Sequence, residues 1–236
     1  MVSILIPTRN EFANIEKALE SVSEAMKRDG IEYEVLVIDD GSNDGTVEKT
    51  QRVAAANQNI RLIQRKPPYG FGNSIRDGIA LAKGDACVVL MADLSDDPEL
   101  IAQMKKEMDS GADMVIGSRF VNGAKISGYP FAKMASNRAF NLAIQVGLLS
   151  GVTDSSNAFK MFRTEIAREI ALESKGFEIS AELTAKFIIR KAKIKEIPAS
   201  WKDREGGEAK FKLGKESGRY FGLYLNILKK AYLGGK

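Results

Sequence analysis

Three clusters of polar side chains, each placed directly after a short apolar segment, are the residues of this chain best suited to chemistry. They are residues 7–11, residues 39–42 and residues 92–97. If the apolar segments are parallel strands, their carboxyl ends share one edge of a sheet, where open α/β sheets bind ligands. Carboxylates there suit ribose hydroxyls or a divalent cation beside a phosphate. A solvated turn would explain each cluster alone, but the recurrence favours a binding site.

The composition excludes several kinds of chemistry. The chain has no histidine, which removes histidine-based triads, general bases and metal sites. Any metal must therefore be held by oxygen ligands, which favours Mg²⁺ or Mn²⁺. Cys87 is the single cysteine, so an intramolecular disulfide is impossible. No glycine-rich phosphate loop precedes the first predicted helix, which argues against a dinucleotide enzyme or a P-loop NTPase.

The formal charge of +4 is unevenly distributed along the chain. Residues 190–236 contain thirteen Lys or Arg against five Asp or Glu, an excess of +8. Such a segment suggests an anionic partner, although a solvated basic face is the alternative. We expect no nucleic-acid partner, because basic and aromatic residues do not interleave on a recognisable module.

Apolar segments alternate with helical periodicity through the first half of the chain. This pattern predicts an α/β fold with a mostly parallel sheet and helices on both faces. The predicted strands cover residues 2–6, 34–38, 60–64, 86–91 and 113–117. Beyond Arg119 we expect helices over 131–149, 180–191 and 216–232, a strand over 158–162 and an edge strand over 194–201. Residues 202–213 are predicted to form a polar, mobile loop.

The motifs of this chain resemble those of the family 2 inverting glycosyltransferases, which have a GT-A fold. The resemblance rests on residues 6–11, 38–46, 72–78, 92–94 and 117–120. Residues 155–163 and 203–210 are similar to the branch that contains dolichol-phosphate (polyprenyl-phosphate) mannosyltransferases and glucosyltransferases. This resemblance to the glycosyltransferases implies a catalytic domain over 1–213 and a C-terminal amphipathic helix over 214–236.

The same resemblance implies roles for individual residues. Asp93, Arg119 and Arg204 would be catalytic, and Asp93 with Ser95 would hold the metal. The donor would be bound by Pro7, Arg9, Glu11, Ile38, Asp40, Ala92, Asp93, Ser95, Arg119, Arg204 and Lys210. Apart from the resemblance, bringing two phosphates together needs cations. We therefore expect Ser136, Arg138 and Arg163 to bind the acceptor phosphate, with Lys133 and Asn137 as weaker candidates.

The resemblance further implies transfer of a sugar, with mannose favoured, from a nucleotide diphosphate sugar to a polyprenyl or dolichyl phosphate. The expected donor is GDP-mannose, with a UDP-sugar possible. A phosphate acceptor is already anionic near neutral pH, so the reaction needs no general base. A protein that makes the sugar nucleotide is disfavoured, because it would need a glycine-rich activating loop. A UDP-sugar enzyme (glucose or GlcNAc donor) and a non-catalytic nucleotide-sugar binder stay open as alternatives.

Two positions depart from the family pattern. Met91 stands where the family has the first acid of its Asp-X-Asp motif, and Asn157 replaces a glycine. The loss at Met91 predicts either compensation by Ser95, Asp96 or water, or weaker metal binding.

The final helix combines apolar and aromatic side chains with flanking Arg219, Lys229 and Lys230. This composition suits a helix in a membrane interface, and a helix packed on the catalytic domain is the alternative. No apolar stretch reaches the ~18 residues of a membrane span. We therefore expect a peripheral protein on the cytoplasmic face of a membrane.

Overall fold

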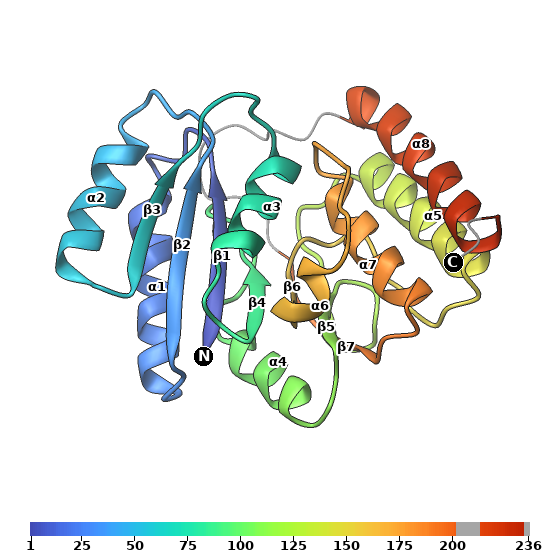
Figure 1. Cartoon of the computed structure of the whole chain (residues 1–236), viewed down its shortest axis with the longest axis horizontal. Coiled ribbons are helices and arrows are strands. Elements are labelled where there is room, and N and C mark those ends of the chain that lie inside the picture. Colours follow the sequence, from blue (N-terminus) through green and yellow to red (C-terminus); the bar gives the residue numbers. More distant parts are fainter. Residues whose placement is uncertain (202–212, 234–236) are drawn as a thin grey trace.

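A seven-stranded sheet forms the centre of the molecule (Figure 1). The computed structural model describes residues 1–201 and 213–233. The spatial order of the strands is β3-β2-β1-β4-β6-β5-β7. The strands are β1 (Val2–Thr8), β2 (Tyr33–Asp39), β3 (Ile60–Gln64), β4 (Ala86–Val89), β5 (Met114–Ser118), β6 (Lys160–Arg163) and β7 (Ile194–Pro198).

Helices cover both faces of this sheet because the buried strands are apolar on both sides. Ile4 and Ile6 face α1 and α4, whereas Leu5, between them, faces α3. This alternation divides the core into two layers, one on each face. The helices are α1 (Ile15–Arg28), α2 (Thr46–Ala56), α3 (Phe71–Leu81), α4 (Leu100–Asp109), α5 (Phe131–Gly147), α6 (Thr164–Arg168), α7 (Ile179–Ile189) and α8 (Leu213–Tyr232).

The predicted α/β fold with a mostly parallel sheet is confirmed. All strand pairs are parallel except those of β6, which runs antiparallel to both β4 and β5. The carboxyl ends of the other six strands therefore meet at one edge. Lys160 pairs with Val89 at this edge, and Arg163 pairs with Ala86 at the opposite one. The edge position predicted for the strand that contains Pro198 is also confirmed.

Pro7 does not end the first strand, as its lack of a backbone N–H had suggested. Leu5 accepts a hydrogen bond from the backbone N–H of Leu90, so the backbone of Leu5 faces β4. Alternate residues face the same neighbour, so the nitrogen of Pro7 also faces that side. The pairing of β1 with β4 ends at Leu5 and Val89. Pro7 therefore breaks no ladder hydrogen bond, and β1 continues to Thr8 beside β2.

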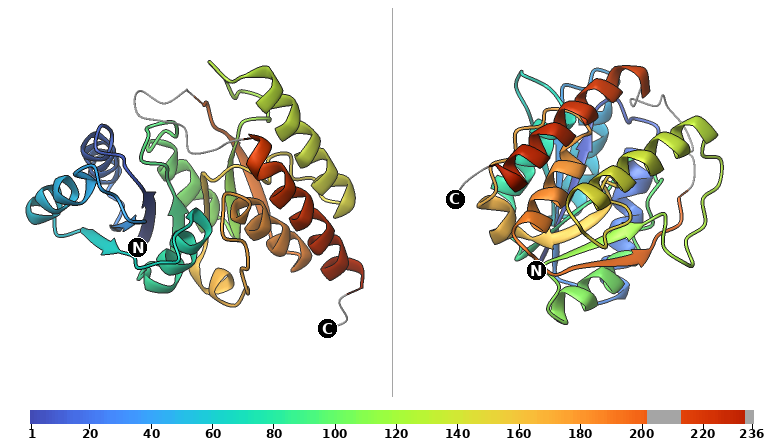
Figure 2. Two further views of the ribbon diagram at one scale, coloured as in Figure 1. Left: turned by 90° about the horizontal axis from the view of Figure 1, so that it is seen from above. Right: turned by 90° about the vertical axis from the view of Figure 1, so that its right-hand side faces the viewer.

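Helices α5 and α8 lie side by side outside α7, at one end of the molecule (Figure 2). Leu223 and Ile227 of α8 are buried against Ile144 of α5 and Ala181 of α7. Phe221 and Leu225 of α8 are exposed. The last helix is thus packed on the rest of the protein along one face, and its outward side presents Leu225 together with Asn226 and Lys229. A separate C-terminal unit beginning at residue 214 stays a prediction.

Candidate functional site

A pocket of about 180 Å³ lies at the edge where the parallel strands end; we call it the edge pocket. It collects side chains from the loops after β1, β4 and β5, from the segment before β6, and from α5, α7 and α8. Its lining residues are Glu11, Met91, Asp93, Ser95, Asp96, Arg119, Tyr129, Lys133, Asn137, Ser156, Asn157, Ala158, Phe177, Ser180, Trp201 and Tyr220.

One wall of the edge pocket is acidic and comes from the loop after β4. Asp93 accepts a hydrogen bond from the backbone N–H of Ser95 at 3.2 Å, and Asp96 accepts one from that of Met91 at 3.3 Å. Burial, and then the nearby charge of Asp93, raise the pKa of Asp96 to about 7. The side chain of Met91, at the position of the lost acid, lines the same wall.

These residues fit a divalent cation only together with a ligand. Within residues 1–201 and 213–233, no three acidic or cysteine side chains are grouped closely enough to hold a metal. Asp93, Ser95 and Asp96 nevertheless offer only oxygen atoms, which Mg²⁺ and Mn²⁺ prefer. A diphosphate would supply the remaining oxygen ligands. The donor set therefore fits a metal that arrives with its nucleotide.

The opposite wall is built around Arg119, which follows β5. Its Nε and Nη2 donate to the two carboxylate oxygens of Asp154, each at 2.8 Å, and its backbone N–H donates to the same group at 3.0 Å. Asp154 is fully buried and Arg119 is 9% exposed. The attraction of Asp154 raises the pKa of Arg119 against the effect of burial, which alone would lower it. The guanidinium is thus a permanent cation with a fixed orientation.

A hydrogen-bond network holds the segment that contains Asp154. Asn141 of α5 donates to Ser156 Oγ at 3.0 Å and accepts from Ser155 Oγ at 2.7 Å. Glu196 of β7 accepts from the backbone N–H groups of Thr153 and Asp154 at 2.8 and 3.0 Å. Asp154 therefore cannot turn away from Arg119 without breaking several buried hydrogen bonds.

The third side of the pocket is aromatic and cationic. The rings of Tyr129 and Trp201 meet edge to face with centroids 4.6 Å apart. Lys133 Nζ lies 5.0 Å from the centre of the Tyr129 ring and 5.8 Å from that of Trp201. The Tyr129 hydroxyl accepts hydrogen bonds from Asn137 and, at 3.3 Å, from Arg119. The guanidinium of Arg119 and the ammonium of Lys133 therefore both lie close to the ring of Tyr129.

The two aspartates that end β2 have different environments. Asp40 forms a buried ion pair with Arg65 and accepts the backbone N–H of Gly70 at 2.7 Å. Asp39 is 3% exposed, and its Oδ2 accepts from the N–H groups of Gly41 and Ser42. The other oxygen of Asp39, Oδ1, is buried and has no hydrogen-bond partner. Asp39, which lies in the predicted cluster 39–42 but not among the predicted donor-binding residues, is therefore the aspartate with an unfilled acceptor at this edge.

Six residues named from the sequence come together in the edge pocket: Glu11, Asp93, Ser95, Arg119 and the weaker candidates Lys133 and Asn137. Their roles stay predictions. Pro7 and Ala92 are buried at the ends of β1 and β4 beside this pocket. Arg9 is exposed and lies over the ring of Tyr69, with 5.6 Å between the guanidinium carbon and the ring centroid. Arg204 and Lys210 lie outside the described residues, as does the predicted loop around them.

Two predicted binding residues are wrong. Ile38 is fully buried in the core, where its side chain faces Gly78 of α3, so it offers no surface to a nucleoside. Arg163 lies at the opposite edge of the sheet because β6 runs antiparallel. There it donates to the carbonyl oxygen of Met108 at 3.1 Å and approaches Asp113. Arg163 cannot bind an acceptor in the edge pocket.

The other predicted acceptor ligands are displaced around α5. Arg138 is exposed and stacks on Phe120 at 4.7 Å, and Ser136 lines an adjoining cavity between α5 and α8 rather than the edge pocket. The α5 residues that line the edge pocket are Lys133 and Asn137, four positions apart and so on one helix face.

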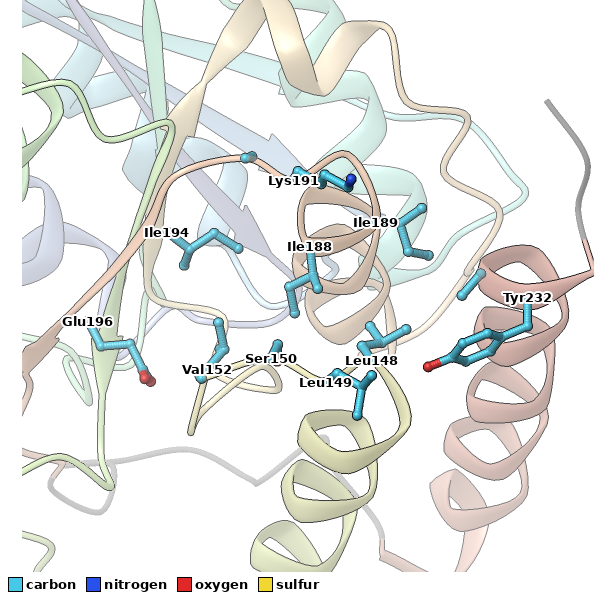
Figure 3. Close-up of a pocket in the computed structure, with 13 residues that line it drawn as sticks. Leu148, Leu149, Ser150, Val152, Ile188, Ile189, Lys191, Ile194, Glu196 and Tyr232 are labelled. Carbon is cyan, nitrogen blue, oxygen red and sulfur yellow. The ribbon is translucent and has the colours of Figure 1, made fainter.

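A larger cavity, of about 620 Å³, lies far from the strand ends, where α5, α7 and α8 terminate (Figure 3). Most of the residues that line it are apolar, as Leu149, Val152 and Ile188 illustrate. Its only acid, Glu196, is already engaged with Thr153 and Asp154. The groups needed for chemistry are in the edge pocket instead.

The arrangement of strands and helices is that of the GT-A glycosyltransferases. Glucosyl-3-phosphoglycerate synthase from Mycobacterium tuberculosis, solved with Mn²⁺, UDP-glucose and phosphoglyceric acid, superposes with a TM-score of 0.76. It is 16% identical and covers 97% of this chain and 79% of its own. The same protein has also been solved with Mg²⁺ and UDP.

The chain belongs to glycosyl transferase family 2, whose model matches residues 3–171. It is 32% identical to the dolichol-phosphate mannosyltransferase of Pyrococcus furiosus over 97% of this chain, which spans 64% of that relative's length. It is 31% identical to the undecaprenyl-phosphate mannosyltransferase of Micrococcus luteus, covering 90% of this chain and 88% of the relative. The predicted family is confirmed.

Asp154→Asn should lower the free energy of unfolding by about 3–5 kcal/mol, because it leaves the buried Arg119 without its counter-charge. Urea denaturation measures this loss. The matched control is Glu169→Gln, which removes an exposed ion pair with Arg190 and should cost less than about 1 kcal/mol. Equal stability of the two variants would show that Arg119 does not depend on Asp154.

Met91→Asp should tighten Mn²⁺ binding about tenfold, equivalent to ~1.4 kcal/mol, because it adds a carboxylate to the wall that contains Asp93 and Asp96. Calorimetric titration with Mn²⁺ in the presence of a nucleoside diphosphate measures the affinity. Met91→Leu has a similar volume and no oxygen atom, and so serves as the control. Equal Mn²⁺ affinity in the two variants would mean that position 91 does not face the metal.

Proposed function

We propose that this protein transfers a sugar, with mannose favoured, from a nucleotide diphosphate sugar to a polyprenyl phosphate with inversion at the anomeric carbon. The observation that supports this proposal best is that the edge pocket and a second, apolar cavity have lining residues in common. The edge pocket shares Lys133, Asn137 and Tyr220 with an apolar cavity of about 300 Å³ between α5 and α8. A pocket that contains Arg119 and Lys133 and adjoins an apolar cavity matches an acceptor with a phosphate head and a hydrocarbon tail.

The apolar cavity is lined by aromatic side chains from two helices. Phe140 of α5 and Tyr220, Phe221 and Tyr224 of α8 form its walls. Both helices also expose large apolar residues toward solvent, namely Phe131, Leu142, Val146, Phe221 and Leu225. An exposed apolar surface over two neighbouring helices supports contact with the membrane that would hold the lipid acceptor. Within the described residues, no helix is long and apolar enough to span a membrane.

The donor half of the proposal rests on the loops after β1, β2 and β4. The unfilled Oδ1 of Asp39 is the acceptor that we assign to the nucleoside, with the carboxylate of Glu11, which accepts from Asn14 at 3.0 Å, lining the pocket nearby. Asp93, Ser95 and Asp96 would hold a divalent cation against the diphosphate. When bound, Mg²⁺ or Mn²⁺ would supply charge neutralisation for the leaving group.

In the proposed reaction, an oxygen of the acceptor phosphate attacks the anomeric carbon from the face opposite the leaving group. One carbon–oxygen bond forms to this phosphate while the bond to the nucleoside diphosphate breaks. The attacking oxygen is already deprotonated, so the site needs no general base. Arg119 and Lys133 stabilise the acceptor phosphate and reduce its repulsion with the diphosphate. The absence of histidine is consistent with this chemistry.

Incubating the protein with GDP-mannose, UDP-glucose or UDP-GlcNAc, together with polyprenyl phosphate and Mn²⁺, tests the proposal. We expect a mannosyl lipid by mass spectrometry, and at least a hundredfold loss of product with Asp93→Ala. The control Asp109→Ala removes an exposed carboxylate that pairs with Lys105 on α4 and should keep wild-type turnover. A glucosyl or GlcNAc lipid would assign a UDP-sugar donor instead. Nucleotide-sugar binding without any product would identify a non-catalytic binder.

The double variant Leu142→Ser/Leu225→Ser should reduce binding to anionic vesicles at least fivefold, because it removes apolar side chains that are 58% and 51% exposed. Vesicle flotation measures the bound fraction. Leu81→Ser, which changes an exposed leucine on α3, is the control and should bind as the wild type does. Equal flotation of all three proteins would contradict membrane contact through α5 and α8.

A further inference from the structure

A lysine is buried directly beneath the edge pocket. Lys160 of β6 is 1% exposed and lies at the site edge of the sheet, where it pairs with Val89. Its Nζ donates to the carbonyl oxygens of Ser155 and Ser180 at 3.0 and 2.7 Å, and to Thr184 Oγ1 at 2.5 Å. All three acceptors are neutral. A lysine is rarely so deeply buried, and burial without a directly bonded carboxylate is costly.

The three hydrogen bonds connect two elements that line the edge pocket. Ser155 lies between Asp154, which holds Arg119, and Ser156, whose hydroxyl is 3.2 Å from Arg119 Nη2. Ser180 lines the pocket from the first turn of α7. One ammonium group therefore fixes the segment that orients Arg119 against the helix that forms the pocket floor.

We propose that Lys160 is a positioning residue for the transfer reaction: it holds the Asp154–Ser156 segment so that Arg119 faces the acceptor phosphate. This inference rests on the proposed function. Lys160 does not line the pocket and touches no substrate, so it acts only through Ser155, Asp154 and Arg119. Its removal should impair use of the acceptor and leave nucleotide binding largely unchanged, because the acidic wall after β4 belongs to a different loop.

The protonation state of Lys160 gives this role a pH signature. Burial lowers the pKa of Lys160 to about 7; the charges of Asp154 and Glu196 oppose this shift, and that of Arg119 adds to it. The amine is thus charged below about pH 7 and neutral above. A neutral amine keeps two N–H donors for the two carbonyl oxygens, and its lone pair can accept from the Thr184 hydroxyl. Titration therefore keeps these contacts but replaces charge-assisted hydrogen bonds by weaker neutral ones. The segment is then held less firmly, so the wild-type kcat/KM for the acceptor should decline above about pH 7.

Three variants test the role. Lys160→Met removes the hydrogen bonds, Lys160→Arg keeps a permanent charge, and Thr184→Val removes one acceptor. The control is Lys195→Met, an exposed lysine on β7. We measure kcat/KM for farnesyl phosphate, its binding by calorimetry, and nucleoside diphosphate affinity, each between pH 6 and 9.

Lys160→Met should lose at least tenfold in kcat/KM for farnesyl phosphate, with less than a twofold change in nucleotide affinity. Lys160→Arg should recover part of this loss and should lack the wild-type decline above pH 7. Thr184→Val should shift that decline to lower pH, because a hydrogen bond to the charged amine favours its charged form. Lys195→Met should match the wild type.

Wild-type kinetics and pH profile in Lys160→Met would overturn the role of Lys160 while leaving the proposed function intact. If Lys160→Met does not fold, Thr184→Val decides, and an unshifted profile in that variant overturns the role. A wild-type protein that neither binds farnesyl phosphate nor forms product contradicts the proposed function, and with it this inference.

Discussion

The buried ion pair between Arg119 and Asp154 is the constraint on which the edge pocket depends. It joins the end of β5 to the segment before β6, and neither charge can be left alone in the interior without a cost of several kcal/mol. Asn141, Glu196 and Lys160 then hold that segment from three other elements. The pocket is therefore assembled by long-range polar contacts, although each of its walls is a local loop.

The fold was predictable because its signals are local. Continuous apolar runs such as residues 35–38, each followed by turn residues and a helical period, specify a parallel sheet whatever their exact partners are. Glu11, Asp93, Ser95 and Arg119 were found for the same reason, since the end of a parallel strand fixes the edge at which its next residues lie. The direction of β6 was not accessible in this way. The sequence of a four-residue strand does not indicate whether it runs parallel or antiparallel to its neighbours. Arg163 was therefore expected at the wrong edge of the sheet.

The remaining errors involve geometry that spacing alone does not determine. Each residue of an α-helix turns the side chain by about 100°, so Ser136 and Arg138 do not line the edge pocket although Asn137, between them, lines it together with Lys133. The different roles of Asp39 and Asp40 depend on Arg65, which is contributed from the end of β3. Asp154 was missed because its partner is 35 residues away in the chain.

The antiparallel strand β6 lies where the part of the sheet built from residues before 90 meets the part built from later residues. Residues before 90 build β3, β2, β1 and β4, whereas later residues build β6, β5 and β7. In the function proposed above, most of the nucleoside contacts are encoded in the first part and the acceptor contacts in the second. The two parts are nevertheless one structural unit, because β4 pairs with β6 and Arg76 donates to the carbonyl oxygen of Ser174. Donor and acceptor specificity are thus written in consecutive stretches of one gene that can only fold together.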